Sequence, residues 1–239
     1  MLKILVTICA RGGSKGIPKK NIKHLNGKPL ISYSINHAFN FSESHPNVDI
    51  ALSTDDNEIK NISSKYGLNT SYTRPFELSG DKIGKIVVIK DLLNYYENLN
   101  KVKYDMILDL DVSSPLRTQE NLQLALKKLL DNKNAINLFS VSEARRNPYF
   151  NVVELNDEGY CQLVKKSFAK TRQSSPEVFD MNASFYFYKR VFFEKNYKSA
   201  ITNRSLHYLM NHTCFDLDDP LDFQIMEFLI SQNKLKIKI

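Results

Sequence analysis

The segment ARGGSKGIPKKN at residues 10–21 has the composition of a loop that binds phosphate groups. Between residues 11 and 28 the chain carries six lysines or arginines, four of its eight glycines and no acidic residue. Glycine lets backbone N–H groups approach an anion, and Arg11, Lys15 and Lys20 can donate charge-assisted hydrogen bonds. The segment matches neither common glycine-rich phosphate motif. A solvated basic loop would explain neither the clustered glycines nor the missing acids, so we predict phosphate binding.

Two D-L-D tripeptides place carboxylates two residues apart, Asp109 with Asp111 and Asp216 with Asp218. Residues i and i+2 of an extended chain face the same side, so each pair can point at one ligand. Mg²⁺ prefers one or two carboxylates together with phosphate oxygens of a substrate. Aspartates that cap a helix or a turn are the alternative for each pair. Beside a phosphate-binding loop, we favour a magnesium site.

Several arginines have the chemistry to bind a carboxylate of a small substrate. Arg117 ends the polar turn SSPLR, and Arg145, Arg146 and Arg172 lie in a stretch without regular hydrophobic pattern, upstream of Asn182. A guanidinium group can hold a carboxylate through two parallel hydrogen bonds. An ordinary strand-to-helix turn and solvent-exposed loop arginines are the alternatives.

The hydrophobic pattern predicts an α/β fold in which these polar segments connect strands to helices. Short apolar runs predict strands at 3–9, 48–53, 104–111, 135–141 and 183–188. Apolar residues at helical spacing predict helices at 30–39, from a cap at Asp55 to about Tyr66, at 82–99, 118–130 and 220–231. This alternation is typical of a doubly wound, mainly parallel sheet. We expect one domain over residues 1–239, with a small lobe at 143–180, where the pattern is lost.

The polar clusters follow the predicted strands at their carboxyl ends. They occupy residues 11–21, 53–55 and 109–117, and 216–218 follow a weaker apolar run at 207–215. In an open α/β sheet, ligands bind beyond the carboxyl ends of the strands. We therefore expect these clusters to converge on one site.

The composition is that of a folded globular protein. Of the 239 residues, 42% are hydrophobic and 25% are charged, and no apolar run is long enough to cross a membrane. The chain begins directly with a predicted strand, so we expect a soluble cytoplasmic protein that makes no membrane contact. Three cysteines without C-x-x-C spacing favour neither a disulfide framework nor a zinc site.

The net charge of +7 fits a pocket for an anionic small molecule or a surface for nucleic acid. The chain has no recognised nucleic-acid motif and no tryptophan, so we expect no nucleic-acid partner. A nucleotide-sugar glycosyltransferase is the stronger rival, because such enzymes use D-x-D to hold a metal and a diphosphate. The basic loop at 11–20 argues against that rival.

Five motifs together resemble the acylneuraminate cytidylyltransferase family, and they occur in the same order over nearly the whole chain. They are ARGGSKGIPKKNI at 10–22, STD at 53–55, RPFEL at 74–78, SSPLR at 113–117 and FDLD at 215–218. The resemblance implies a nucleotidyltransferase fold and a homodimer built partly through a protruding lobe, for which 143–180 is the candidate. It also implies the reaction, in which CTP and a nine-carbon 2-keto sugar acid (a nonulosonic acid) give the CMP-sugar and pyrophosphate with Mg²⁺.

The same resemblance assigns roles to residues of this chain. Arg11, Lys15 and Lys20 are expected to offset charge on the leaving pyrophosphate, and Asp111 or a water held by Asp218 is expected to take the hydroxyl proton. Metal binding is expected at Asp216 and Asp218. Nucleotide binding is expected at Ala10, Arg11, Gly12, Gly13, Ser14, Lys20, Asn21 and Arg74, and sugar binding at Asp111, Ser113, Arg117, Arg172 and Asn182.

The chain departs from the N-acetylneuraminate pattern in two motifs. It has DVSSPLR where many such enzymes have QPTSPLR, and MNAS at 181–184 where N-G-A is usual. The combination of these motifs with RRNPYFN and TRQSSP resembles the bacterial branch that acts on N,N′-diacetyllegionaminate. The expected acceptor is therefore N,N′-diacetyllegionaminate or N-acetylneuraminate.

Overall fold

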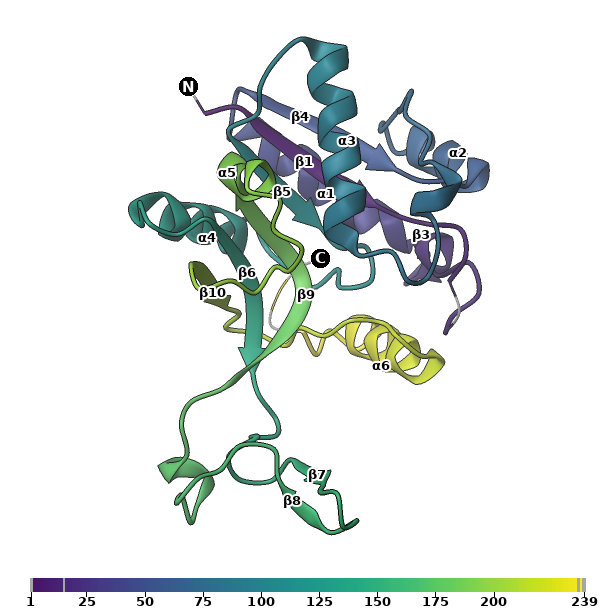
Figure 1. Ribbon diagram of the computed structural model, residues 1–239. Helices are drawn as coiled ribbons and strands as arrows, with labels where there is room; N and C mark the ends of the chain where they lie inside the picture. Colours follow the sequence, from purple (N-terminus) through teal and green to yellow (C-terminus); the bar gives the residue numbers. More distant parts are fainter. Residues whose placement is uncertain (1, 15, 236, 238–239) are drawn as a thin grey trace.

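A six-stranded sheet forms the centre of the computed structural model, which describes residues 2–14, 16–235 and 237 (Figure 1). The strand order is β10-β6-β9-β5-β1-β4. All neighbouring pairs are parallel except those of β9, which runs antiparallel to β5 and to β6. The sheet is therefore mainly parallel, as predicted. The strands are β1 Ile4–Cys9, β4 Val48–Ser53, β5 Met106–Leu110, β6 Asn137–Glu143, β9 Phe179–Lys189 and β10 Ser205–Leu209.

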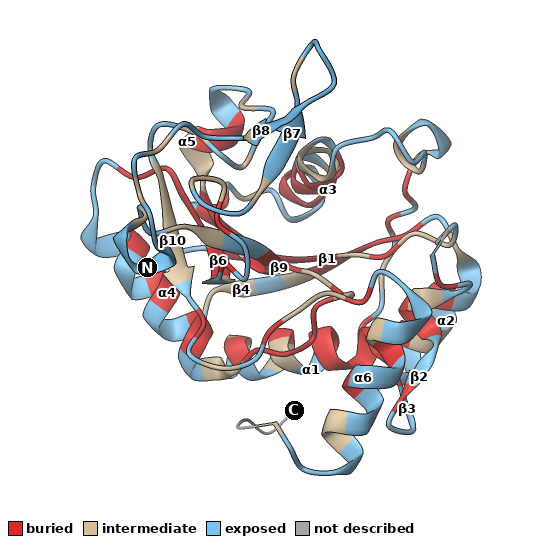
Figure 2. Cartoon of the chain, turned by 90° about the horizontal axis from the view of Figure 1, so that it is seen from below, coloured by how far each residue is buried: buried red, intermediate tan, exposed pale blue. Residues whose placement is uncertain are grey.

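Helices cover both faces of this sheet, which confirms the doubly wound α/β architecture (Figure 2). On one face lie α1 (Leu30–Glu43), α2 (Asn57–Lys65), α4 (Gln119–Asp131) and α6 (Pro220–Ser231), and on the other lie α3 (Lys85–Asn100) and α5 (Arg190–Glu194). Two short strands, β2 (His24–Leu25) and β3 (Lys28–Pro29), form a hairpin that the hydrophobic pattern does not predict.

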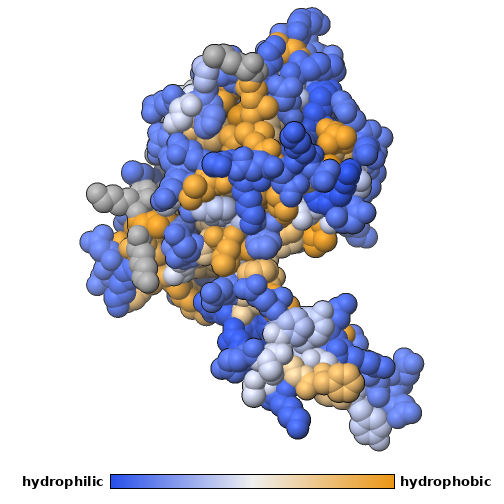
Figure 3. Space-filling view, turned by 90° about the vertical axis from the view of Figure 1, so that its left-hand side faces the viewer, coloured by the Kyte–Doolittle hydropathy of each residue, from blue (hydrophilic) through white to orange (hydrophobic). Residues whose placement is uncertain are grey.

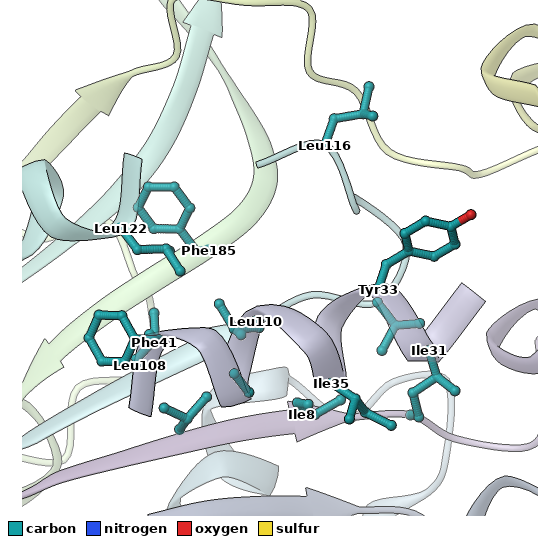
Figure 4. Packing of buried hydrophobic residues seen from close by; sticks show 14 of the residues in the cluster. Ile8, Ile31, Tyr33, Ile35, Phe41, Leu108, Leu110, Leu116, Leu122 and Phe185 are labelled. Atoms are coloured by element: carbon teal, nitrogen blue, oxygen red, sulfur yellow. The ribbon is translucent and has the colours of Figure 1, made fainter. Parts of the chain in front are cut away.

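Each face of the sheet has its own hydrophobic core because successive side chains of a strand alternate in direction. Figure 4 shows Ile35 of α1 beside Ile8 of β1, and Phe41 of α1 beside Leu108 of β5. Ile107, the neighbour of Leu108 in β5, points to the opposite face and packs in the core under α3 and α5. Burying a large aliphatic or aromatic side chain stabilises the fold by about 1.5–3 kcal/mol. The same alternation directs Asp109 of β5, and Asp111 just after the strand, toward Lys85 of α3.

Helix boundaries follow the expected caps with two differences. Thr118 caps α4, and Asp219 with Pro220 at the first helical position begins α6, as predicted. Asp56, not Asp55, caps α2, because its carboxylate accepts the N–H groups of Glu58 and Ile59. Helix α3 begins at Lys85, after Gly84, instead of at residue 82.

Residues 144–178 leave the sheet between β6 and β9 and form a projection (Figures 1 and 3). Its hairpin consists of β7 (Val153–Leu155) and β8 (Cys161–Leu163), and a short 3₁₀ helix follows at Arg172–Ser174. Six large apolar or aromatic side chains of the projection are exposed: Phe150, Val153, Leu155, Tyr160, Val164 and Phe168. The projection falls within residues 143–180, where the hydrophobic pattern is lost; its role in dimerisation or substrate binding stays a prediction. In the described part of the chain, no helix is long and apolar enough to cross a membrane.

Candidate active site

A cavity of about 400 Å³ lies at the carboxyl ends of β1, β4 and β5; we call it the first cavity. Segments that are far apart in the sequence meet in its wall, as the polar clusters predict. Of the expected site residues, the first cavity is lined by Arg11, Ser14, Lys20, Asn21, Arg74, Asp111, Ser113 and Asp218.

The basic loop after β1 is fixed by contacts at its two ends. The N–H of Ala10 donates to the Ser53 carbonyl (2.9 Å), and Asn21 Nδ2 donates to the Arg11 carbonyl (2.8 Å). Gly12 packs against Asp56, and Gly12 N–H donates to the carboxylate of Asp55 (3.0 Å). The Ala10 N–H, the Arg11 carbonyl and the Gly12 N–H are therefore occupied by hydrogen bonds within the protein.

Not every expected residue of this loop reaches the wall of the first cavity. Ala10 is wholly buried, and the wall of the cavity includes none of Ala10, Gly12 and Gly13. Lys15 lies outside the described residues. Arg11 does reach the wall, where its Nη1 lies 2.7 Å from Asp81 Oδ1.

Lys20 and Gly16 bring the basic loop against the D-L-D segment at 216–218. Lys20 Nζ donates to the Leu217 carbonyl (2.6 Å) and lies 3.6 Å from Asp218 Oδ1. A Cβ atom at Gly16 would lie only 2.1 Å from the Asp218 carbonyl oxygen. The position therefore requires glycine, and the loop and the aspartate segment form one unit.

Arg74 is held by the end of β4. The side chain is only 6% exposed, and its Nε and Nη2 donate to Ser53 Oγ (2.9 Å) and the Ser53 carbonyl (2.8 Å). Ser53 thus gives the STD motif a physical role, which is to orient an arginine of the first cavity.

Lys85 lies between the two carboxylates that end β5, and no sequence motif marks it. Its Nζ is 2.6 Å from Asp109 Oδ2 and 2.6 Å from Asp111 Oδ2. Burial alone would lower the pKa of Lys85, but the charges of Asp109 and Asp111 raise it well above its usual value. Asp109 and Asp111 face the same side, as i and i+2 spacing predicts, but they bind an ammonium group.

The environment of Asp111 argues against a role as general base. Its Oδ1 accepts both the N–H (2.8 Å) and the hydroxyl (2.7 Å) of Ser113. Burial alone would raise the pKa of Asp111, but the Lys85 charge and these hydrogen bonds lower it to about 2. A carboxylate with so low a pKa is a poor proton acceptor near neutral pH.

Arg117 is wholly buried and lines neither cavity, so the structure gives no support to the expected contact with a sugar, which stays a prediction. Its guanidinium donates to Ser184 Oγ (3.1 Å), to the Ser114 carbonyl (2.6 Å) and to the Asp111 carbonyl. Burial lowers the pKa of Arg117 to about 10. Arg117 instead fixes the turn that carries Asp111 and Ser113.

A second cavity, of about 280 Å³, is lined by Asn182 and Asp216. Asn182 accepts a hydrogen bond from Ser140 Oγ (2.6 Å) and donates one to Ser142 Oγ (2.9 Å), so its amide is fixed. Asp218 lines the first cavity and Asp216 lines the second, so the D-L-D segment separates the two.

Arg172 lies at neither cavity. Its Nη2 donates to the Ala144 carbonyl (2.7 Å), which ties the two arms of the lobe together. Within this chain the expected contact of Arg172 with a sugar beside Asn182 is therefore not formed.

The described residues contain no group of three or more histidine, cysteine or acidic side chains that could hold a metal by themselves. Asp216 and Asp218 remain a pair of oxygen donors between the cavities. Burial, and then the charge of Asp218, raise the pKa of Asp216. A cation between the two carboxylates would relieve that repulsion, so the pair fits Mg²⁺ with additional oxygens from a substrate.

A sequence profile of the cytidylyltransferase family matches residues 5–222, which is most of the chain. The chain belongs to the cytidylyltransferase family. This cytidylyltransferase is 42% identical over 238 residues to the post-translational flagellin modification protein B of Campylobacter coli. It is 40% identical over 238 residues to the CMP-N,N′-diacetyllegionaminic acid synthase of Campylobacter jejuni. Each alignment covers 100% of this chain and 99% of the relative.

A solved structure shares the fold of this cytidylyltransferase. The CMP:2-keto-3-deoxy-manno-octonic acid synthetase complexed with CTP superposes with a TM-score of 0.67 at 17% identity, covering 97% of this chain and 99% of that one. The predicted nucleotidyltransferase fold is thus confirmed. Membership of the family decides against the glycosyltransferase and nucleic-acid-binding alternatives.

Proposed function

We propose that this cytidylyltransferase transfers CMP from CTP to the anomeric hydroxyl of N,N′-diacetyllegionaminate and releases pyrophosphate. The observation that carries the proposal is the meeting of two cavities at residues 216–218. The basic first cavity suits a nucleoside triphosphate, and the second cavity suits the acceptor on the other side of the same aspartates. The name of the 40% identical Campylobacter jejuni relative supports the choice of acceptor.

In this proposal the first cavity binds CTP. Arg11, Ser14 and Lys20, which line this cavity, hold the phosphates, together with Lys15. Gly12 and Gly13 lie outside the cavity wall and the Gly12 N–H is occupied by Asp55, so we assign these two glycines no phosphate contact. Asn21 and Arg74 are buried, hydrogen-bonded side chains, so they offer fixed donors to the rest of the nucleotide. Ala10 anchors the start of the loop in the hydrophobic core.

Mg²⁺ would be held by Asp216 and Asp218, where it would neutralise charge on the phosphate oxygens. The anomeric oxygen attacks the α-phosphorus, the new P–O bond forms as the bond to pyrophosphate breaks, and Arg11 and Lys20 stabilise the departing charge. The hydroxyl proton must leave as this bond forms. The sequence offers two groups that could accept this proton, Asp111 and a water held by Asp218. The low pKa of Asp111 makes it a poor base, so we assign the proton to the water beside Asp218.

The acceptor sugar would contact Asn182 and Ser113, which lie on opposite sides of the aspartate segment.

We further propose that the lobe joins two copies of the chain in a homodimer, because it exposes Val153, Leu155 and Phe168. Arg172 would then act from the lobe and not within its own chain. Light scattering of the purified protein tests this, with the mass of two chains expected and that of one chain contradicting it.

The decisive experiment measures pyrophosphate release from CTP and Mg²⁺ with three acceptors offered separately. These are N,N′-diacetyllegionaminate, N-acetylneuraminate and pseudaminate. A strong preference for N,N′-diacetyllegionaminate is expected. A preference for another acceptor would overturn the choice of sugar, and no release with any of them, from folded protein that binds CTP, would overturn the proposed acceptor class.

A further inference from the structure

The contact of Lys85 with Asp109 and Asp111 has the arrangement of a small cation site. Two carboxylates at positions i and i+2, Asp109 in β5 and Asp111 directly after it, converge on a single atom, Lys85 Nζ, at 2.6 Å from one oxygen of each. Asp111 and Lys85 both line the first cavity. Paired carboxylates at the edge of a phosphate-binding cavity are typical ligands of a divalent metal ion. Here an ammonium group of the chain itself fills the position.

The surroundings hold both carboxylates in place around this ammonium group. Asp109 is wholly buried, and its Oδ1 accepts a hydrogen bond from Thr7 Oγ1 (2.8 Å). Asp111 is fixed by Ser113, as described above. With their other oxygens engaged, both groups turn Oδ2 toward Lys85. A buried carboxylate without a compensating charge is costly, so Asp109 requires a cation here.

Lys85 is supplied by the start of α3 and retains some access to the first cavity. It is the first residue of the helix, and its side chain is 32% exposed. A lysine at a helix N-terminus is unfavourable for the helix dipole, and the two carboxylates offset that cost. Lys85 Nζ donates a hydrogen bond to Asp111 Oδ2, whereas its contact with Asp109 Oδ2 is an ion pair without hydrogen-bond geometry. An ammonium group has three N–H donors, so donor capacity remains for an anionic ligand.

We propose that Lys85 is a built-in cation that occupies the position of a divalent metal ion between Asp109 and Asp111, keeps metal away from this pair and directs positive charge into the first cavity. The chain then needs metal only at Asp216 and Asp218. This inference goes beyond cytidylyl transfer, and its test does not depend on turnover.

The test counts Mn²⁺ bound to the full chain without nucleotide, by electron paramagnetic resonance of the free ion. The wild type is compared with Lys85→Ala, Lys85→Arg, and the double variant Lys85→Ala with Asp111→Asn. Lys103→Ala is the matched control, because Lys103 Nζ also contacts a buried carboxylate, Glu97 Oε2, at 2.9 Å and lines neither cavity. Lys85→Ala should bind one more Mn²⁺ per chain than the wild type.

The remaining variants decide where that extra ion binds. The double variant should lose it, and Lys85→Arg and Lys103→Ala should match the wild type. An unchanged count in folded Lys85→Ala, or an extra ion that survives Asp111→Asn, would overturn the proposal. If Lys85→Ala does not fold alone, it should fold on refolding with Mn²⁺ but not with Na⁺ at equal ionic strength. Failure under both conditions would also overturn it.

Discussion

The Asp218 carbonyl lies so close to Gly16 that a Cβ atom there would be 2.1 Å from the oxygen. This contact, with the hydrogen bond from Lys20 to Leu217, joins the phosphate-binding loop to the proposed metal ligands. The relative position of the two segments therefore depends on the absence of one methyl group. Catalysis that relies on positioning is sensitive to displacements of about 1 Å.

We predict that Gly16→Ala lowers kcat/KM for CTP by about a hundredfold, because the loop must move away from Asp218. The melting temperature should change little, since residue 16 is exposed. Gly84→Ala is the control: a Cβ at Gly84 meets nothing within 4 Å, and its φ is −67°. Comparable kinetics of the two variants would show that the close contact has no role in turnover.

Asp218→Ala should reduce kcat by about a thousandfold, as expected when a main source of electrostatic stabilisation is removed. The fold should remain intact, because the Asp218 side chain is 74% exposed. Steady-state pyrophosphate release at subsaturating Mg²⁺ measures the effect, and circular dichroism checks the fold. Near wild-type kinetics under these conditions would remove Asp218 from the proposed metal site.

Arg11→Ala should lower kcat/KM for CTP more than kcat/KM for the acceptor sugar. Arg11 lines the first cavity and not the second, and in the proposed complex it binds the phosphates of CTP and not the sugar. A lost charge-assisted hydrogen bond of about 1.5–3 kcal/mol corresponds to roughly a tenfold to hundredfold loss. Equal losses for both substrates would indicate that Arg11 has a structural role.

Asp111 should make stability depend on pH in the acid range. Its pKa is lowered from 3.8 to about 2 in the folded state, so the carboxylate stabilises the fold fully above its unfolded pKa. That contribution, about 2 kcal/mol, is lost as the pH falls from about 4 to 2. Urea unfolding of the wild type and Asp111→Asn measures it. The difference between them should shrink over this range, and a constant difference would contradict the low pKa.

The sequence by itself determined the features that depend on neighbouring residues. Three of these features are local patterns. Thr118 caps α4, Asp219 and Pro220 begin α6, and residues of the basic loop line the first cavity. Alternating strands and helices predicted the mainly parallel sheet, because each pattern reflects a face that must be buried. The sheet in turn placed the polar clusters at one edge.

Tertiary packing decided which distant side chains meet. Lys85 carries no sequence signal, because its partners Asp109 and Asp111 lie at the end of β5 and just after it, and they reach Lys85 only when α3 packs on the sheet. Arg117 looked like a ligand of the substrate, but packing buries it among carbonyl oxygens that need its donors. Arg172 likewise bonds the lobe instead of a cavity. Type and spacing show what a charged side chain can bind, whereas burial and the nearest opposite charge determine what it does bind.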